Sequence, residues 1–383
     1  ISGPLDENTG FMIGGYYAAG NGVRDPGFQA EKGGQITANI SHDFNGRDSV
    51  LVYARYLNDR GQWLLPIPVN VNGSQTTPYA GFDAGTGTLM GPETRITTNL
   101  GGQRVDLADG RGAKVINTGL TFDYEIADGV RFRERMSYLG GNANTFGLVP
   151  AGAPVTAAAM ATTLGGAGST VGTLTYVNGG GAVATGANTA VMRAGIWSVE
   201  KKITSFVADT GLEFKSGGNK LTGGFYFADF TTKDVWSLGN QVLLTATPQA
   251  RLLNMTLADG RIATSNGFTS GPGYQVRGFY TGRDYAFYAV DELQVTEQLR
   301  IDGGVRWESD RATALDGNNA SAVNTAARIV EIRPGVFEQL VPQGTVGVLP
   351  TVGSTFDGTF ATRRATQQKA AWTIGANYLL TPD

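Results

Sequence analysis

A period of two in the placement of apolar side chains most constrains what this chain can fold into. In residues 116–126 every second side chain is apolar or threonine, and polar side chains or glycine fill the positions between. This spacing is typical of a β-strand with two different faces. The turn residues Asp128 and Gly129 follow, and a second alternating run then begins. Residues 114–138 therefore predict a β-hairpin.

Pairing Ile126 with Val130 sets the register of this hairpin. That register places residues of opposite charge across the two strands, namely Glu125 opposite Arg131 and Asp123 opposite Arg133. Such cross-strand pairs contribute roughly 0.2–1 kcal/mol each. Strands of about ten or more residues exceed the usual soluble length of about five or six and match the length that crosses a bilayer. A soluble β-sandwich is the alternative explanation for one amphipathic hairpin.

Similar runs recur along the chain, so we expect about ten strands. Beyond the hairpin they cover residues 11–17, 34–44, 50–59, 199–215, 220–238, 280–295, 299–311 and 369–380. In the 280–311 hairpin, pairing Val295 with Leu299 places Asp291 on the apolar face, which predicts either a bulge there or a different register.

The connections between these runs sort into two kinds. Short turns alternate with long segments, at residues 60–112, 147–195, 239–279 and 314–364. Outer-membrane barrels have short periplasmic turns and long extracellular loops. Aromatic residues recur near the short turns, as an interfacial girdle would require: Phe44, Tyr124, Phe214 and Tyr378. We therefore predict an all-β fold, a transmembrane antiparallel up-and-down β-barrel.

Composition agrees with a barrel and excludes several other classes. The 383 residues contain no cysteine, which excludes disulfides and thiol chemistry, and no continuous apolar run long enough for a transmembrane helix. The net charge of −3 gives no reason to expect nucleic acid as a partner. His42 is the only histidine, which excludes a histidine-based metal site or catalytic triad. We expect no cofactor and no metal.

Charged residues on the polar faces are expected to line the lumen. This ladder comprises Asp123, Glu125, Arg131, Arg133, Glu292, Arg300, Asp302 and Arg306. An anion path lined by Arg131, Arg133 and Arg135 is one explanation for the arginine run. A salt-bridge network with the facing carboxylates is the explanation we favour. Glu292 and Asp302 have the spacing of a catalytic pair, but charged ladders are ordinary inside a barrel, and we expect no enzyme.

Four aromatic residues lie in or beside the long segments and are candidates for ligand binding: Trp63, Trp236, Tyr274 and Phe279. Aromatic side chains on loops often contact ligands, whereas aromatics at the bases of loops form the outer interfacial girdle of a barrel. Both explanations remain open.

The opening segment, ISGPLDENTGFMIGGYYAAGNGVRDPGFQAEKGGQI and onward to about residue 65, resembles the start of the barrel in TonB-dependent outer-membrane receptors. Sphingomonad and caulobacter-like members have comparable GGYY, GVRDPGF and KGGQI motifs, found here at residues 14–17, 22–28 and 32–36. After residue 65 the resemblance is architectural only.

This resemblance implies a receptor of the bacterial outer membrane with a plug inside a barrel of about 22 strands. Such a receptor imports a scarce ligand, a siderophore-type iron complex, cobalamin or an oligosaccharide, with energy from the TonB-ExbB-ExbD complex that reaches it through the plug. Residues 1–383 would be a partial barrel domain in contact with membrane lipid, without the plug and the C-terminal strands. The alternatives are a passive outer-membrane porin and a secreted glycine-rich β protein that binds glycans.

Overall fold

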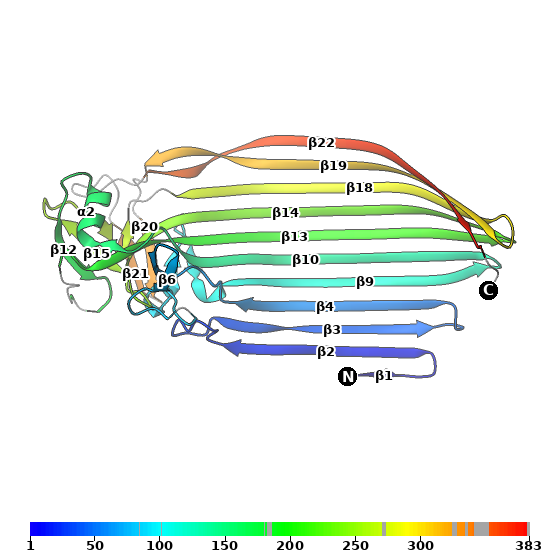
Figure 1. Ribbon diagram of the computed structural model, residues 1–383, viewed down its shortest axis with the longest axis horizontal. Helices are drawn as coiled ribbons and strands as arrows, with labels where there is room; N and C mark the ends of the chain where they lie inside the picture. The colour runs from blue at the N-terminus through cyan, green and yellow to red at the C-terminus, as the bar shows by residue number, and fades with distance from the viewer. Residues whose placement is uncertain are drawn as a thin grey trace.

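The computed structural model describes residues 1–83, 85–100, 102–179, 181, 186–269, 273–323, 328–333, 336–340 and 352–380. Most of this part of the chain belongs to one large antiparallel sheet and four two-stranded sheets (Figure 1). The predicted all-β class is confirmed.

The main sheet is an up-and-down meander, because each long strand pairs antiparallel with the next long strand of the chain. In order, its strands are β1 (Ser2–Pro4), β2 (Thr9–Gly20), β3 (Glu31–Asp43), β4 (Ser49–Gly61), β9 (Arg111–Ala127), β10 (Val130–Pro150), β13 (Ala190–Ser216), β14 (Asn219–Thr245), β18 (Tyr274–Gln294), β19 (Leu299–Val323) and β22 (Val352–Tyr378). This antiparallel up-and-down order is the one that the sequence predicts.

The short turns and the long loops lie at opposite ends of the sheet (Figure 1). At the turn end, Asp128 and Gly129 connect β9 to β10, and Gly217 and Gly218 connect β13 to β14. At the other end the long connections gather together with the smaller elements, as the left side of Figure 1 shows. The predicted sorting of connections is therefore confirmed.

The smaller elements belong almost entirely to these long connections. They are β5 (Val69–Asn72), β6 (Gln75–Pro78), α1 (Pro92–Arg95), β7 (Ile96–Thr98), β8 (Arg104–Asp106), η1 (Leu107–Asp109), β11 (Val155–Thr156), α2 (Ala157–Gly165), β12 (Val171–Tyr176), β15 (Leu253–Leu257), β16 (Thr264–Ser265), β17 (Phe268–Thr269), β20 (Arg328–Arg333) and β21 (Val336–Leu340). Among the described residues, no helix has the length and apolar character needed to cross a membrane.

The β9–β10 hairpin has the predicted register except at its turn. Glu125 lies opposite Arg131, but Val130 pairs with Ala127 and not with Ile126, and the register shifts between Val130 and Arg131. A two-residue turn pairs the residues that flank it directly, which are Ala127 and Val130. One extra residue in β9 then restores the register of the charged pairs, as in a β-bulge.

The β18–β19 hairpin has the predicted register without a bulge near Asp291. The Val295 N–H donates to the Leu299 carbonyl at 2.8 Å, and the ladder continues unbroken past Asp291. Asp291 therefore does lie on the apolar face, where it is exposed near the turn and accepts a hydrogen bond from Asn219 Nδ2 at 2.8 Å. Its position near the end of the strand keeps the carboxylate close to water.

Several strands extend further than predicted, into segments that we expected to be loops. β13 begins at Ala190 and β14 continues to Thr245. Near the loop end, both strands are covered on both faces of the sheet, since Met192 and Leu243 are each at most 1% exposed and belong to different buried clusters. Strands that are buried on both faces lose the alternation of apolar and polar residues, and these segments therefore gave no periodic signal.

Gly129 offers a test of the turn geometry, with Gly217 as the matched control. Both residues have positive φ, +69° and +57°, but a Cβ at Gly129 would also collide with the Lys215 carbonyl, whereas a Cβ at Gly217 meets open space. Each alanine substitution should lower the free energy of unfolding by about 1–2 kcal/mol for the left-handed backbone. Gly129→Ala should lower it by more than Gly217→Ala in urea unfolding. Equal effects would contradict the close packing of this turn.

Candidate functional site

One face of the main sheet carries a network of ion pairs with Asp123 at its centre. Asp123 accepts from Arg131 Nε at 3.0 Å, from Arg133 Nε at 3.1 Å and from Arg135 Nη2 at 3.2 Å. The three arginines share this face because they are two residues apart on β10. All three guanidinium groups contact one carboxylate that is only 18% exposed. We call this side of the sheet the polar face.

Glu213 extends the network to β13. It is 1% exposed and contacts Arg133 Nη1 at 3.1 Å and Lys215 Nζ at 3.0 Å. Asp48, in the turn after β3, accepts the Glu125 N–H at 2.9 Å. Glu213 and Asp48 were not among the residues predicted from the sequence. The alternation within β13 indicated that Glu213 lies on its polar face. Its contact with Arg133 could not be predicted without knowing that β13 pairs with β10.

The remaining ladder residues lie on β18 and β19. Glu292 contacts Lys220 Nζ at 2.8 Å and Arg300 Nη1 at 3.7 Å, and Arg306 pairs with its strand neighbour Glu308 at 3.0 Å. Asp302 lies directly opposite Glu292 in the ladder, as predicted. Within the described residues Asp302 makes no ion pair.

Lys220 connects the two halves of the predicted ladder. Its Nζ lies 2.8 Å from Glu292 and 3.9 Å from Glu213. The charged residues that the sequence placed in two separate hairpins therefore form one continuous polar surface across β9 to β19. A surface of this kind can hydrogen-bond a polar solute or the side chains of another protein segment.

No acidic or histidine cluster suited to a metal occurs on this surface. In the part of the chain that the structure describes, no group of three or more His, Cys, Asp or Glu side chains could hold a metal ion. His42 instead shares a hydrogen bond of 2.8 Å with the Thr9 hydroxyl and packs edge-on against Phe44.

A hollow of about 440 Å³ opens near the loop end of β2, β3 and β4. Tyr16, Glu31, Arg55, Asp59 and Arg111 are among its lining residues. The Tyr16 hydroxyl donates to Asp59 at 2.6 Å. Mixed charges and a phenol next to the loops make this hollow a candidate contact region for a polar ligand.

The long loops pack into one body, which we call the loop cap and define by the described parts of residues 62–110, 151–189 and 246–273. Two clusters of buried apolar residues hold the loop cap against β10, β13 and β14 at the loop end of these strands. One contains Met90, Leu107 and Leu252, and the other contains Met160 and Leu253. The loops therefore have hydrophobic cores of their own.

Arg251 joins all three segments of the loop cap. Its Nε donates to Glu93 at 2.6 Å, its Nη2 donates to the Asn178 carbonyl, and its guanidinium lies 3.8 Å from the centre of the Tyr176 ring. Its role was not evident from the sequence, because its three partners come from two other loops.

The four predicted loop aromatics do not form one cluster. Trp63 packs on Trp197 with ring centroids 6.0 Å apart. Trp236 and Tyr274 lie within β14 and β18, with the parity of the polar face, and Phe279 has the parity of the apolar face. Tyr274 and Phe279 are 50% and 41% exposed. Their part in ligand binding stays a prediction.

Comparisons with known proteins give matches at the level of structure only. No family model and no curated protein matches the sequence. The structure is similar to the closed form of the ferric-catecholate import receptor Fiu from Escherichia coli K12, with 14% identity, a TM-score of 0.46 and coverage of 100% of this chain and 46% of the receptor.

Two further receptors give similar alignments. The ferric yersiniabactin uptake receptor FyuA from Yersinia pestis has 10% identity and a TM-score of 0.39, with coverage of 100% and 42%. The ferric preacinetobactin receptor BauA from Acinetobacter baumannii has 9% identity and a TM-score of 0.35, with coverage of 97% and 56%. The chain thus spans about half the length of these receptors.

Asp123 should contribute strongly to stability, and Asp302 is its matched control. Asp123→Asn leaves three arginines around a neutral amide, so it should lower the free energy of unfolding by about 1.5–3 kcal/mol. Asp302→Asn removes no ion pair and should change it by less than about 0.5 kcal/mol. Urea unfolding of both variants measures the difference. If both variants unfold alike, Asp123 does not hold the network together.

The loop cap should lose one stabilising contribution in acid. Burial raises the pKa of the Asp106 carboxyl, but hydrogen bonds from Arg95 and from the Ala108 N–H outweigh burial and hold the pKa below its usual value. Because folding lowers this pKa, the contribution is complete above the unfolded value of about 3.9 and is lost as the pH falls through the folded value. The stability difference between wild type and Asp106→Asn should therefore shrink between about pH 7 and about pH 3. A difference that grows on acidification would contradict this assignment.

Proposed function

We propose that this chain forms part of the barrel wall, together with the loop cap, of an outer-membrane import receptor of the TonB-dependent kind. The observation that carries the proposal is the two-sided meander, with long strands and with short turns and folded loops at opposite ends. A sheet that packs on a second sheet needs neither this sorting nor such strand lengths.

The apolar face has the dimensions of a membrane-spanning surface. Along β3 and the residue that follows it, this face extends from Ile36 to Phe44, a length of about 26 Å at 3.3 Å per residue, close to the band of about 25 Å in outer-membrane barrels. Large apolar side chains are exposed on this face, with Ile36 at 49%, Trp372 at 78% and Ile374 at 73%. Lipid contact explains such exposure, which water-soluble monomers avoid.

Aromatic side chains border this face at the turn end. Phe44, Tyr124, Phe214 and Tyr378 are between 36% and 59% exposed. Phe44 and Tyr124 also contact each other edge-on at 5.6 Å. Aromatic girdles of this kind mark the membrane interface, and we assign this end to the periplasmic side.

The barrel would close through further strands. β1 and β22 are the outermost strands of the main sheet in the described residues. Open sheet edges are not tolerated in lipid, because unpaired backbone groups there cost several kcal/mol each. We therefore propose that a partial barrel domain pairs at these edges with other strands, and that a plug occupies the lumen against the polar face.

In this proposal the loop cap captures the ligand outside, and the ligand passes along the polar face into the periplasm. Energy would come from the TonB-ExbB-ExbD complex through the plug. The ligand would be a siderophore-type iron complex, cobalamin or an oligosaccharide, and the chain itself would catalyse no covalent reaction. A passive porin would share the wall but would need no energy, and a secreted glycan-binding protein would not enter the membrane.

Cell fractionation and energised uptake test the proposal. The protein should be recovered from the outer membrane only with detergent, and a deletion strain should lose accumulation of one labelled probe among ferric-catecholate, cobalamin and maltooligosaccharide. An uncoupler of the proton gradient should abolish this accumulation. Accumulation that survives the uncoupler would identify a porin, and detergent-free recovery would identify a secreted protein.

Adjacent residues of β13 test which face meets lipid. Ala208 has the parity of Phe206 and Phe214 on the apolar face, and Val207 has the parity of Glu213 on the polar face. Ala208→Arg should destabilise the folded protein by about 2–4 kcal/mol, whereas Val207→Arg should have a much smaller effect. Heat-modifiable migration and urea unfolding in detergent give the comparison. The reverse order of the two variants would exchange the assigned faces.

A further inference from the structure

We propose that the apolar side of the sheet binds the phosphate groups of an anionic phospholipid at its loop end. The proposed site consists of Lys32, Arg60, Lys114, Lys202 and Lys233, which we call the basic belt. This inference rests on the proposed membrane location and adds to it a lipid class and a position.

The pairing registers bring the belt residues together from separate strands. Lys114 of β9 lies between Asn58 of β4 and Asn142 of β10, and Asn142 in turn lies opposite Lys202 of β13. Lys202 lies directly opposite Lys233 of β14. One line across five strands therefore alternates amide and ammonium groups before it ends in two adjacent ammonium groups.

The direct pairing of Lys202 with Lys233 favours the binding of an anion beside them. Like charges directly opposite each other in an antiparallel ladder are destabilising. Both lysines are exposed, and the described residues form no ion pair with Lys32, Lys114, Lys202 or Lys233. Nearby acids on this side are Asp109, which pairs with Arg60, and Glu200. The belt therefore retains a net positive charge.

The belt lies on the side that we assign to lipid. Lys202 has the parity of Phe206 and Phe214, whereas its neighbour Lys201 points to the polar face and pairs with Asp234 at 3.2 Å. The next ladder positions toward the turn end are the exposed Tyr56 and Ile116. The cations thus begin where the apolar surface ends, as lipid headgroups do relative to acyl chains.

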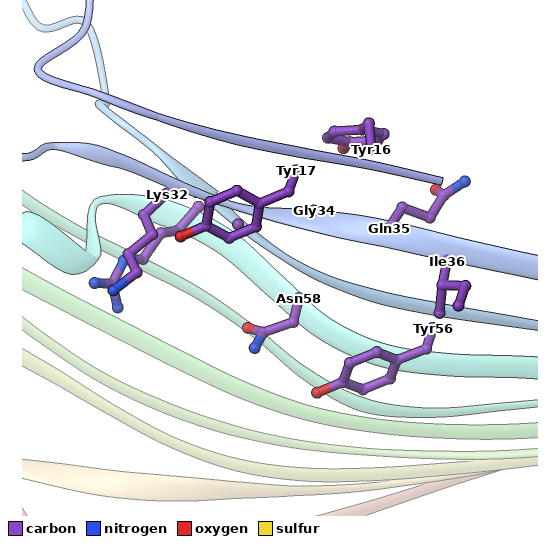
Figure 2. Close-up of a pocket in the computed structure, with 10 residues that line it drawn as sticks. Tyr16, Tyr17, Lys32, Gly34, Gln35, Ile36, Tyr56 and Asn58 are labelled. Carbon is purple, nitrogen blue, oxygen red and sulfur yellow. The ribbon is translucent and has the colours of Figure 1, made fainter. Parts of the chain in front are cut away.

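A hollow at one end of the belt has room for a headgroup. Its volume is about 420 Å³, and its lining includes Tyr17, Lys32, Tyr56, Asn58 and Arg60. Figure 2 shows the side chains of Tyr17, Asn58 and Tyr56 on the same side of the strands, with Tyr16 on the other. Gly34 has no side chain to fill the space between them.

A second hollow continues the first along the belt. Its volume is about 210 Å³, and it shares Asn58 and Arg60 with the first hollow and reaches Lys114, Asn142 and Asn144. Lysine ammonium groups and asparagine amides donate hydrogen bonds to phosphate oxygens. Tyrosine rings suit the boundary between headgroup and acyl chain. The surface therefore fits an anionic phospholipid better than zwitterionic phosphatidylcholine, which also carries a phosphate but whose positively charged choline would meet the same cations.

Lipid retention in detergent tests the proposal. The protein is extracted from membranes, mixed with equal amounts of phosphatidic acid and phosphatidylcholine of the same acyl chains, and examined by native mass spectrometry. Wild type should retain phosphatidic acid in preference. Lys202→Gln should weaken this binding about five-fold, from the attraction of one cation near an anionic surface, and a variant with all four lysines changed to Gln should abolish the preference.

Lys201→Gln is the matched control, because it removes the same charge one residue away on the opposite face. Lys201→Gln should leave the preference for phosphatidic acid unchanged. Lys202→Arg keeps the positive charge and should also retain the preference. Equal retention of the two lipids by wild type, or equal losses in Lys201→Gln and Lys202→Gln, would overturn the belt while leaving the import proposal intact. Recovery of the protein without detergent would overturn both.

Discussion

Backbone pairing between consecutive long strands is the constraint on which the rest of the structure depends. Each strand from β1 to β22 of the main sheet satisfies its backbone groups on its chain neighbour, and this fixes the side of the sheet to which every side chain points. An apolar side and a polar side follow directly from this pairing. The shift at the β9–β10 turn shows how the register is held, since the bulge returns Arg131 to its place opposite Glu125.

The polar and apolar sides carry charge in different ways. On the polar face, the carboxylates of Asp123 and Glu213 each contact more than one cation. On the apolar side, Lys202 and Lys233 lie near the loops and oppose each other without a carboxylate between them. Charge that is balanced within the protein stabilises the wall, whereas charge that is unbalanced within the protein favours an anion from outside it.

Sequence reasoning identified the ladder residues of the candidate site but not their connections. Alternation placed Glu292 and Asp302 on one face, because parity is a local property of a strand. It could not find the contacts of Lys220 with both Glu213 and Glu292, since these require three strands in register. The loop cap was harder still, because its elements are short and its buried residues, such as Met160 of α2 and Leu253 of β15, pack against residues from other segments of the chain.

By itself, the sequence determined the all-β class, the meander order, the two faces of the strands and the sorting of short turns from long loops. These follow from a period of two and from turn residues such as Asp128 and Gly129, which act over a few positions. Only the tertiary structure decided how the long loops pack around Arg251 and which cations meet across strands. The reason is that such contacts join residues far apart in the chain, and their geometry depends on the relative register of several strands at once.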